Sequence, residues 1–169
     1  AKARFLARAQ APIAALETLR LEAGVAVRGD AHLARMQRTA RHFGLRFSLA
    51  EARAYLQQLP ADGVWRLRLT CDAQGRFEHT LTPFTPTAGP VTLALADRPI
   101  VTRGAGAEFL AHKTTRRELY DREWKHYADT LGADEVIYLN EAGELADHGL
   151  AAAALSNGPA SKRLLAPRR

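Results

Sequence analysis

The chain has 169 residues, of which 47% are hydrophobic and 25% are charged, enough for one domain or for two small domains that share a core. This apolar content excludes intrinsic disorder, and the 12 glycines and 8 prolines exclude collagen-like and low-complexity classes. The single cysteine, Cys71, excludes an internal disulfide framework, and the histidines lack metal-ligand spacing. No apolar run is long enough to predict a membrane span, so we expect a cytoplasmic protein without a metal.

The formal net charge of +6 suits nucleic-acid binding, but its distribution argues against that partner. The last nine residues carry four positive charges, on Lys162, Arg163, Arg168 and Arg169, and removing those four from +6 leaves +2 over the other 160 residues. We interpret the basic C-terminus as a solvated tail. We therefore expect neither a nucleic acid nor a membrane as a partner.

The first third of the chain predicts strands followed by a helix. Residues 1–10 have a helical composition and are interpreted as the end of a preceding segment. The alternation of polar and apolar residues from Ile13 to Val27 predicts a strand, a turn and a second strand. Asp30 is expected to cap a helix that ends at Gly44.

A second helix and a hairpin are predicted next. Ser48 and Glu51 form a capping box that opens the helix. Apolar side chains alternate along residues 65–71, and the turn residues 72–75 then send the chain back as a second strand. Three prolines and a glycine in residues 83–90 predict a loop.

The rest of the chain predicts a mixture of strands and one long helix. That helix is expected to carry Tyr127 on the same apolar face as Trp124 and Leu131. The predicted elements are a strand at 91–96, a flexible crossing at 103–106, the helix at 115–131, a strand at 135–139, and a turn at 140–143 with a strand returning through Leu145.

These elements predict an α+β fold in two parts. Residues 1–10 are the tail of a preceding segment, and residues 11–86 form an N-terminal α+β domain. Residues 87–108 form a strand and an interdomain loop. Residues 109–169 form a partial cofactor-binding domain with a basic tail.

Three residues are candidates for chemistry, each with a plainer alternative. Lys113 precedes a helix among other cations, where an amine can be activated to form a Schiff base; the alternative is a surface lysine. Asp147 follows the last predicted hairpin, where a carboxylate can keep a pyridine ring nitrogen protonated; the alternative is a turn aspartate. Arg35 lies near the start of its helix, where its fork can reach a phosphate; the alternative is a solvated arginine.

Four segments in fixed order carry a resemblance to a known family: Glu17-Thr18-Leu19-Arg20, His32-Leu33-Ala34-Arg35, His112-Lys113-Thr114-Thr115-Arg116, and residues 134–144 (DEVIYLNEAGE). In this order they resemble the class IV pyridoxal-phosphate transaminase fold, also called D-amino-acid aminotransferase-like. The chain is most similar to the 4-amino-4-deoxychorismate lyase domain that is fused to aminodeoxychorismate synthase component I. The resemblance implies an α+β, two-domain fold with a truncated second domain.

The resemblance also implies a cofactor site for pyridoxal 5'-phosphate. It places Lys113 on the Schiff-base lysine and Arg35 on the arginine that binds the cofactor phosphate. Asp147 takes the place of the glutamate that contacts the pyridinium nitrogen, and its side chain is one methylene shorter. Thr18 and Arg20 fall on the substrate-side strand. A small-molecule substrate and a homodimer are implied as partners.

The activity implied by the resemblance is a lyase that releases pyruvate from aminodeoxychorismate and gives 4-aminobenzoate for folate synthesis. One alternative is an amino-acid transaminase, because the loops of this fold choose the substrate. The other is a catalytically inactive domain that serves as an interaction module on a synthase. The expected phosphate-binding segment is not found before Arg169, which favours inactivity, whereas Lys113 and Arg35 favour an enzyme.

Overall fold

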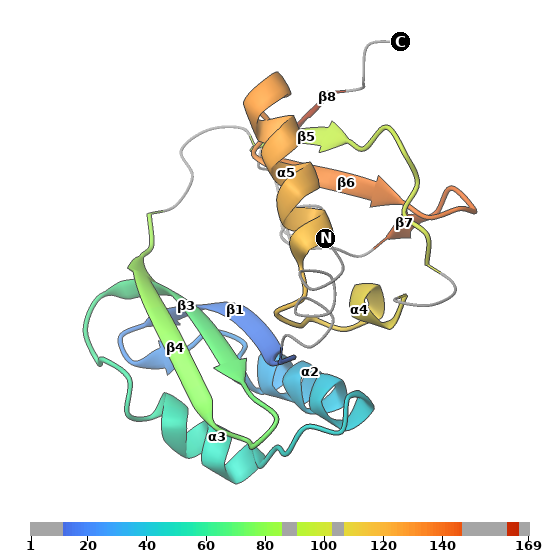
Figure 1. Cartoon of the computed structure of the whole chain (residues 1–169). Helices are drawn as coiled ribbons and strands as arrows, with labels where there is room; N and C mark the ends of the chain where they lie inside the picture. Colours follow the sequence, from blue (N-terminus) through green and yellow to red (C-terminus); the bar gives the residue numbers. More distant parts are fainter. Residues whose placement is uncertain (1–11, 86–90, 103–106, 147–161, 166–169) are drawn as a thin grey trace. The chain divides into compact units, whose positions relative to one another are not determined.

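The computed structural model describes residues 12–85, 91–102, 107–146 and 162–165 (Figure 1). The chain divides into two compact units, a first unit of Ala1–Thr85 with His112–Arg116 and a second unit of Pro86–Ala111 with Arg117–Arg169. The domain bounds expected from the sequence stay a prediction beside this division. None of the described helices is long and apolar enough to cross a membrane. The expected helix at 1–10 and crossing at 103–106 lie outside the described residues.

The first unit is an antiparallel four-stranded sheet with order β2-β1-β3-β4, covered on one face by two helices (Figure 1). The strands are β1 Ala15–Glu22, β2 Val25–Ala26, β3 Val64–Cys71 and β4 Phe77–Pro83, and the helices are α2 Gly29–His42 and α3 Leu49–Leu56. The predicted strands and hairpin are confirmed. Buried residues of α2, α3 and the sheet face beneath them form one hydrophobic core, because side chains alternate across a strand.

The hairpin between β1 and β2 turns on two residues with positive φ, Ala23 at 48° and Gly24 at 76°. Two-residue hairpins favour this backbone because its twist matches that of the flanking strands. A Cβ on Gly24 would lie 3.1 Å from the Cα of Ala61. Glycine is therefore required there both by conformation and by space.

The two helix starts of the first unit differ in how well the sequence predicted them. Ser48 is the N-cap of α3, and its hydroxyl oxygen accepts a hydrogen bond from the Glu51 amide at 3.2 Å, as expected. The expectation that Asp30 caps α2 is wrong, because the N-cap is Arg28, which has a φ of 55° and no side-chain cap. Helix α2 begins directly after the two-residue turn that follows β2. Asp30 instead lies in the first turn and pairs with Arg53 at 2.9 Å.

The second unit is a mixed sheet with order β7-β6-β5-β8. Its central strand β5 runs parallel to β6 and to β8, while β7 is antiparallel to β6. Its elements are β5 Val91–Leu95, α4 Glu108–Ala111, α5 Glu118–Leu131, β6 Glu135–Leu139, β7 Leu145–Ala146 and β8 Lys162–Leu165. The predicted strands at 91–96 and 135–139 are confirmed. An α+β chain with sheets of both kinds agrees with the expected fold class.

Two expectations for the second unit are corrected. Lys162 and Arg163 were interpreted as part of a solvated tail, but they begin strand β8, which pairs with the edge of β5. The apolar face expected on α5 is incomplete, because Trp124 is 45% exposed and Leu131 is 39% exposed. Tyr127 is the residue of this group that packs into the core, where its phenol oxygen accepts a hydrogen bond from the Asp97 amide at 2.7 Å.

The core of the first unit predicts the cost of a cavity. Leu67→Ala removes a fully buried side chain from β3 and is expected to lower the free energy of unfolding by about 3 kcal/mol. The single cysteine, Cys71, is buried in the same core, and burial raises the pKa of its thiol to about 11. Its labelling by a thiol reagent in increasing urea therefore measures unfolding of this unit.

The matched control for that experiment is Val25→Ala, which truncates a side chain that is 66% exposed. It is expected to change the free energy of unfolding by less than about 0.5 kcal/mol. Equal effects of the two variants would contradict the assignment of this core.

Candidate functional site

The segment that carries Lys113 lies beside the first strand of the sheet, about a hundred residues away in sequence. Ala15 and Thr114 are paired in an antiparallel bridge. The Leu16 amide donates to the Lys113 carbonyl at 2.9 Å, and the Thr115 amide donates to the Ala14 carbonyl at 3.0 Å. These bonds place residues 113–115 as a short extra strand at the β1 edge, within the first unit.

This pairing places the backbone of Lys113 at the edge of the sheet. Ala15 and Thr114 lie opposite each other and are both buried, at 0% and 1% exposure. Because Ala15 packs into the core on the helix-covered face, Leu16 lies on the other face of β1, and Lys113 lies across from Leu16 at the edge of that strand. Lys113 itself is half-buried. Its amine is thus placed by backbone hydrogen bonds rather than by a flexible loop.

A buried carboxylate lies on the helix-covered face of the same strand. Glu17 is fully buried and accepts two hydrogen bonds from Arg35, from Nε at 2.6 Å and from an Nη atom at 2.6 Å. His32 Nδ1 lies 2.8 Å from the second carboxylate oxygen of Glu17. Both partners come from α2, one turn apart. The two-point contact fixes the plane of the Arg35 guanidinium.

Neighbouring residues stabilise the ionised form of Glu17. Burial alone raises the pKa of Glu17, but hydrogen bonds from Arg35 and His32, together with the positive charges of Arg35 and Lys113, lower it below its usual value overall. Glu17 is therefore ionised at neutral pH. It is also the group that relates the two predicted site residues, because Lys113 and Arg35 both act on it electrostatically.

Arg35 is suited to a phosphate because its guanidinium group is oriented and partly exposed. Its side chain is 43% exposed although its fork is bound to a buried carboxylate. An arginine has five N–H donors, and two of them point to Glu17. A primary amine at Lys113 and an oriented guanidinium at Arg35 are the donor types that the aldehyde and the phosphate of pyridoxal 5'-phosphate require. The described residues fit this cofactor; Asp147 lies outside them.

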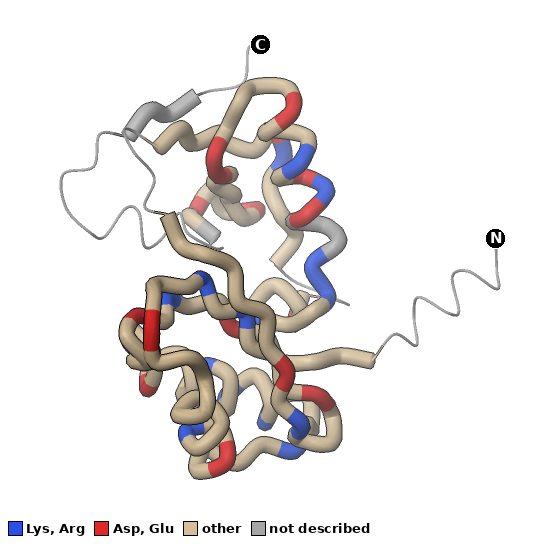
Figure 2. Tube along the Cα trace, turned by 90° about the vertical axis from the view of Figure 1, so that its left-hand side faces the viewer, with Lys and Arg blue, Asp and Glu red and all other residues tan. Residues whose placement is uncertain are grey.

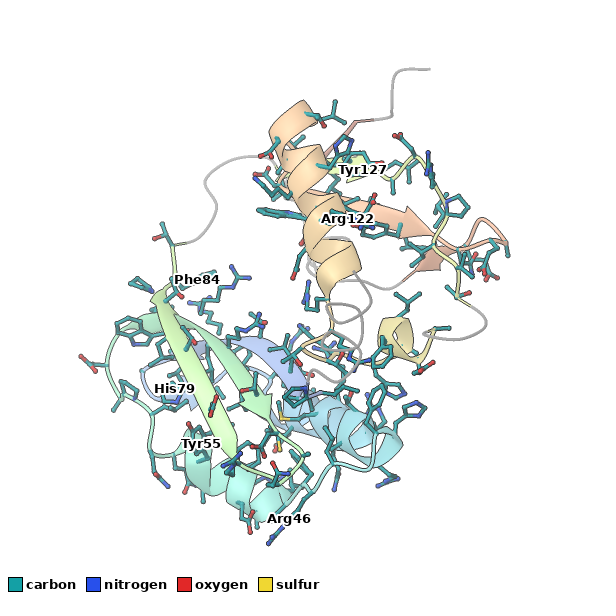
Figure 3. All side chains as sticks on the ribbon, viewed as in Figure 1. Arg46, Tyr55, His79, Phe84, Arg122 and Tyr127 are labelled. Carbon is teal, nitrogen blue, oxygen red and sulfur yellow. The ribbon has the colours of Figure 1, made fainter. Side chains whose placement is uncertain are left out.

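The two expected substrate-side residues lie on the face opposite Glu17. Thr18 is half-buried and Arg20 is exposed. An ion pair of 2.8 Å joins Arg20 to Glu22, and the Arg20 guanidinium lies 5.4 Å from the centre of the Phe84 ring (Figure 3). Thr18 and Arg20 are two residues apart on β1 and thus share one sheet face.

A pair of stacked imidazoles precedes Lys113. The rings of His42 and His112 lie 4.0 Å apart between centroids, and Phe43 meets His112 edge-on. Burial lowers the pKa of His112, and the charges of His42 and Arg38 lower it further. A neutral His112 therefore adds no positive charge next to the amine at neutral pH.

Sequence reasoning assigned no role to Glu17, His32 or His42. The signal for Glu17 was present in the alternation, because it occupies an inward position between apolar residues, where a charge requires partners. His32 and Arg35 are three residues apart and so share a helix face. Nothing in the sequence indicates that His42 meets His112. The described residues contain no group of three or more histidine, cysteine, aspartate or glutamate side chains that could hold a metal ion.

A family model and several solved structures match most of this chain. The family model of Amino-transferase class IV matches residues 14–160. A search of curated proteins found no match. Among solved structures, a candidate amino-acid aminotransferase from Mesorhizobium loti is 31% identical, with a TM-score of 0.64 over 79% of this chain and 65% of that one.

Two further solved structures share the fold. A candidate 4-amino-4-deoxychorismate lyase is 26% identical, with a TM-score of 0.61 over 81% of this chain and 57% of that one. The pyridoxal-phosphate-bound form of a hypothetical aminotransferase from Mycobacterium tuberculosis is 21% identical, with a TM-score of 0.62 over 83% of this chain and 56% of that one. The chain therefore spans less than two thirds of the length of each of these three structures.

The buried carboxylate gives a pH-dependent prediction. Glu17→Gln removes the charge that binds Arg35 and His32 and is expected to lower the free energy of unfolding by about 2 kcal/mol at pH 7. The folded-state pKa of Glu17 lies below its ordinary 4.5, so the wild-type advantage is present above that value. It declines as the pH falls through the folded-state pKa, because the proton then binds the wild-type carboxylate too.

Urea unfolding of both proteins at pH 7 and at progressively lower pH measures this difference. The control is Glu22→Gln, which breaks an exposed ion pair with Arg20 and is expected to cost less than about 1 kcal/mol. A Glu17→Gln deficit that stays constant down to acidic pH would contradict the ionised pair.

Proposed function

The chain belongs to the class IV aminotransferases, and on that premise we propose that it acts as a pyridoxal-phosphate-dependent lyase of the 4-amino-4-deoxychorismate type. The reaction releases pyruvate and leaves 4-aminobenzoate, a precursor for folate synthesis. Class IV aminotransferases use pyridoxal 5'-phosphate, and a solved relative of the same fold carries it. The substrate, the reaction and the roles of single residues are our proposal.

The observation that carries the proposal is the arrangement around Glu17. Lys113 and Arg35 come from distant parts of the sequence, yet both belong to the first unit and both act on the same buried carboxylate. An unrelated lysine and arginine on the protein surface would not be expected to act electrostatically on the same buried carboxylate. The lyase-like segments at 17–20, 32–35 and 112–116 are the same segments that build this arrangement.

Each residue then has a defined role. Lys113 would hold the cofactor through Nζ, and Arg35 would bind its phosphate through the guanidinium group. Thr18 and Arg20 contact the substrate from the sheet face opposite Glu17. Asp147 is proposed as the carboxylate that contacts the cofactor ring nitrogen.

The chemistry requires one acid–base group in the chain. When bound, pyridoxal 5'-phosphate supplies an electron sink for the carbon that bears the substrate's amino group. Lys113 takes the proton from that carbon. The bond from the neighbouring ring carbon to the enolpyruvyl oxygen breaks, the leaving group is protonated to pyruvate, and the ring becomes aromatic. No oxidant or second substrate is consumed.

An amino-acid transaminase is the second candidate, and a specific observation favours it. The structure with 31% identity is described as an amino-acid aminotransferase, and both activities need the same lysine and phosphate anchor. The family also supports the proposals of a homodimer and a cytoplasmic location. Resemblance of the sequence to a synthase-fused domain supports aminodeoxychorismate synthase as a fused or separate partner.

Covalent cofactor attachment tests the role of Lys113. Wild-type protein mixed with pyridoxal phosphate and reduced with borohydride is expected to carry the label on Lys113, and Lys113→Ala to lose nearly all of it, because Lys113 is the only lysine at this edge among the residues that the structure describes. Peptide mapping by mass spectrometry measures the label. Lys125→Ala, which removes an exposed lysine paired with Asp129, should keep the label. A label that persists in Lys113→Ala would make the assignment wrong.

Product analysis separates the lyase from the transaminase. With aminodeoxychorismate, the loaded protein is expected to release pyruvate and 4-aminobenzoate in equal amounts without any added 2-oxo acid, because elimination needs no amino acceptor. Activity that depends on an added 2-oxo acid would support the transaminase instead. Neither activity, together with no label on Lys113, would support the inactive interaction module.

A further inference from the structure

Three aromatic rings meet where the end of α2 contacts the segment that carries Lys113. The imidazoles of His42 and His112 are stacked, with ring centroids 4.0 Å apart and an angle of 23° between the ring planes. The Phe43 ring meets both edge-on, at 4.8 Å from His42 and 5.6 Å from His112. His42 is exposed, whereas Phe43 and His112 are half-buried. All three belong to the first unit, so this cluster joins the end of a helix to the residue that precedes Lys113.

Lys113 is held from both of its sides in the chain. Toward the C-terminus, residues 113–115 are held by the backbone hydrogen bonds to the edge of β1. Toward the N-terminus, the His112 ring packs on His42. Backbone hydrogen bonds do not titrate near neutral pH, but an imidazole does, because its ordinary pKa of 6.5 lies in that range. The ring stack is therefore the anchor of Lys113 that responds to pH.

The charged groups that act on His112 are basic. From α2, His42 and Arg38 act on it electrostatically, and their charges lower its pKa in addition to the lowering that burial causes. Lys113 follows it directly in the chain. Helix α2 has Asp30 in its first turn, and its later charged residues are basic (Lys and Arg are blue in Figure 2). A proton on His112 therefore adds a like charge to a half-buried, basic environment.

Protonation of the pair weakens the stack. Two neutral imidazoles can lie face to face, whereas two imidazolium ions with centroids 4.0 Å apart repel each other. Because packing lowers the pKa of His112, the detached segment binds the proton more tightly than the packed segment does. The stabilisation that the stack provides is therefore present above the ordinary pKa of 6.5 and declines as the pH falls below that value.

We propose that His42 and His112 form a pH-sensitive clasp that positions Lys113. At neutral and higher pH, the stacked rings hold residues 113–115 on the edge of β1. When both rings are protonated, they separate, and the segment detaches from that edge more often. The two histidines are positioning residues, because they act through the backbone of Lys113. The clasp is a property of the fold, and its consequence for cofactor attachment rests on the proposed function.

Amide hydrogen exchange of the full chain, resolved by NMR, tests the clasp without cofactor. The Thr115 amide, which donates to the Ala14 carbonyl, is compared at about pH 7.5 and about pH 5 as a protection factor, which corrects for the intrinsic pH dependence of exchange. In wild type its protection is expected to fall several-fold at the lower pH, because the segment opens more often. Glu17 stays ionised at both, because its folded-state pKa lies below 4.5. Strand β3 is the internal reference and is expected to keep its protection.

Two substitutions of the exposed His42 separate its charge from its packing. His42→Phe keeps an aromatic ring against His112 that cannot take a proton, and it is expected to keep the Thr115 protection high at both pH values. His42→Ala removes the ring and is expected to lower that protection at both. The matched control is His126→Phe, because His126 is also exposed on a helix and also meets the next residue's ring edge-on. This control should show the wild-type pH dependence, and thermal unfolding at the higher pH checks that each variant is folded.

Titration of the His112 ring gives a second readout that does not depend on a variant. Its carbon-bound ring protons, followed by NMR in the wild-type chain, are expected to titrate below 6.5. In His42→Phe the midpoint is expected to move toward that value, because one of the charges that lowers the pKa is gone. A wild-type midpoint at or above 6.5 would contradict the clasp.

Three exchange results would also overturn the proposal: equal Thr115 protection at the two pH values, a fall that persists in His42→Phe, or an equal fall in β3. Cofactor attachment is measured separately. Where pyridoxal phosphate labels Lys113, His42→Phe is expected to raise the yield of label at the lower pH relative to the higher pH, compared with wild type; an unchanged ratio would contradict the positioning of Lys113. The expected exchange behaviour without any label on Lys113 would contradict the proposed function and support the clasp.

Discussion

The carboxylate of Glu17 is the group on which the rest of the candidate site depends. It is fully buried in the sheet, so its charge is tolerated only because Arg35 and His32 bind it. The same contacts fix Arg35 in one orientation on α2. The positive charge of Lys113 also favours the ionised form of Glu17. A carboxylate within the core thereby connects a helix and a distant strand edge into one unit.

The sequence predicted most of the first unit, because its signals are local. Alternating residues at 65–71 and the capping box at Ser48 determine structure over a few residues, and both are observed. Predictions failed where another local conformation or a long-range tertiary contact determined the structure. Asp30 is not the N-cap because α2 begins at Gly29, directly after the turn that follows β2. Lys162 and Arg163 are not in a solvated tail because they pair with β5 as part of strand β8.

The candidate site was predictable as a set of residues but not as a geometry. Lys113 and Arg35 were identified by resemblance to a family, and their roles stay predictions. Their relation through Glu17 could not be read from the sequence, because the pairing of residues 113–115 with β1 is a tertiary contact. Periodicity shows that residues alternate, but not which strand lies beside them.

The bridge between Ala15 and Thr114 has a consequence for folding kinetics. Contacts between residues so far apart in sequence require a large loop to close, which slows folding relative to local hairpins. The β1–β3–β4 sheet can form while the chain is still being synthesised, but its edge strand is supplied only after the first strand of the second unit has been made. The amine of Lys113 is therefore among the last parts of the first unit to reach its place, after the arginine of α2 is already bound to its carboxylate.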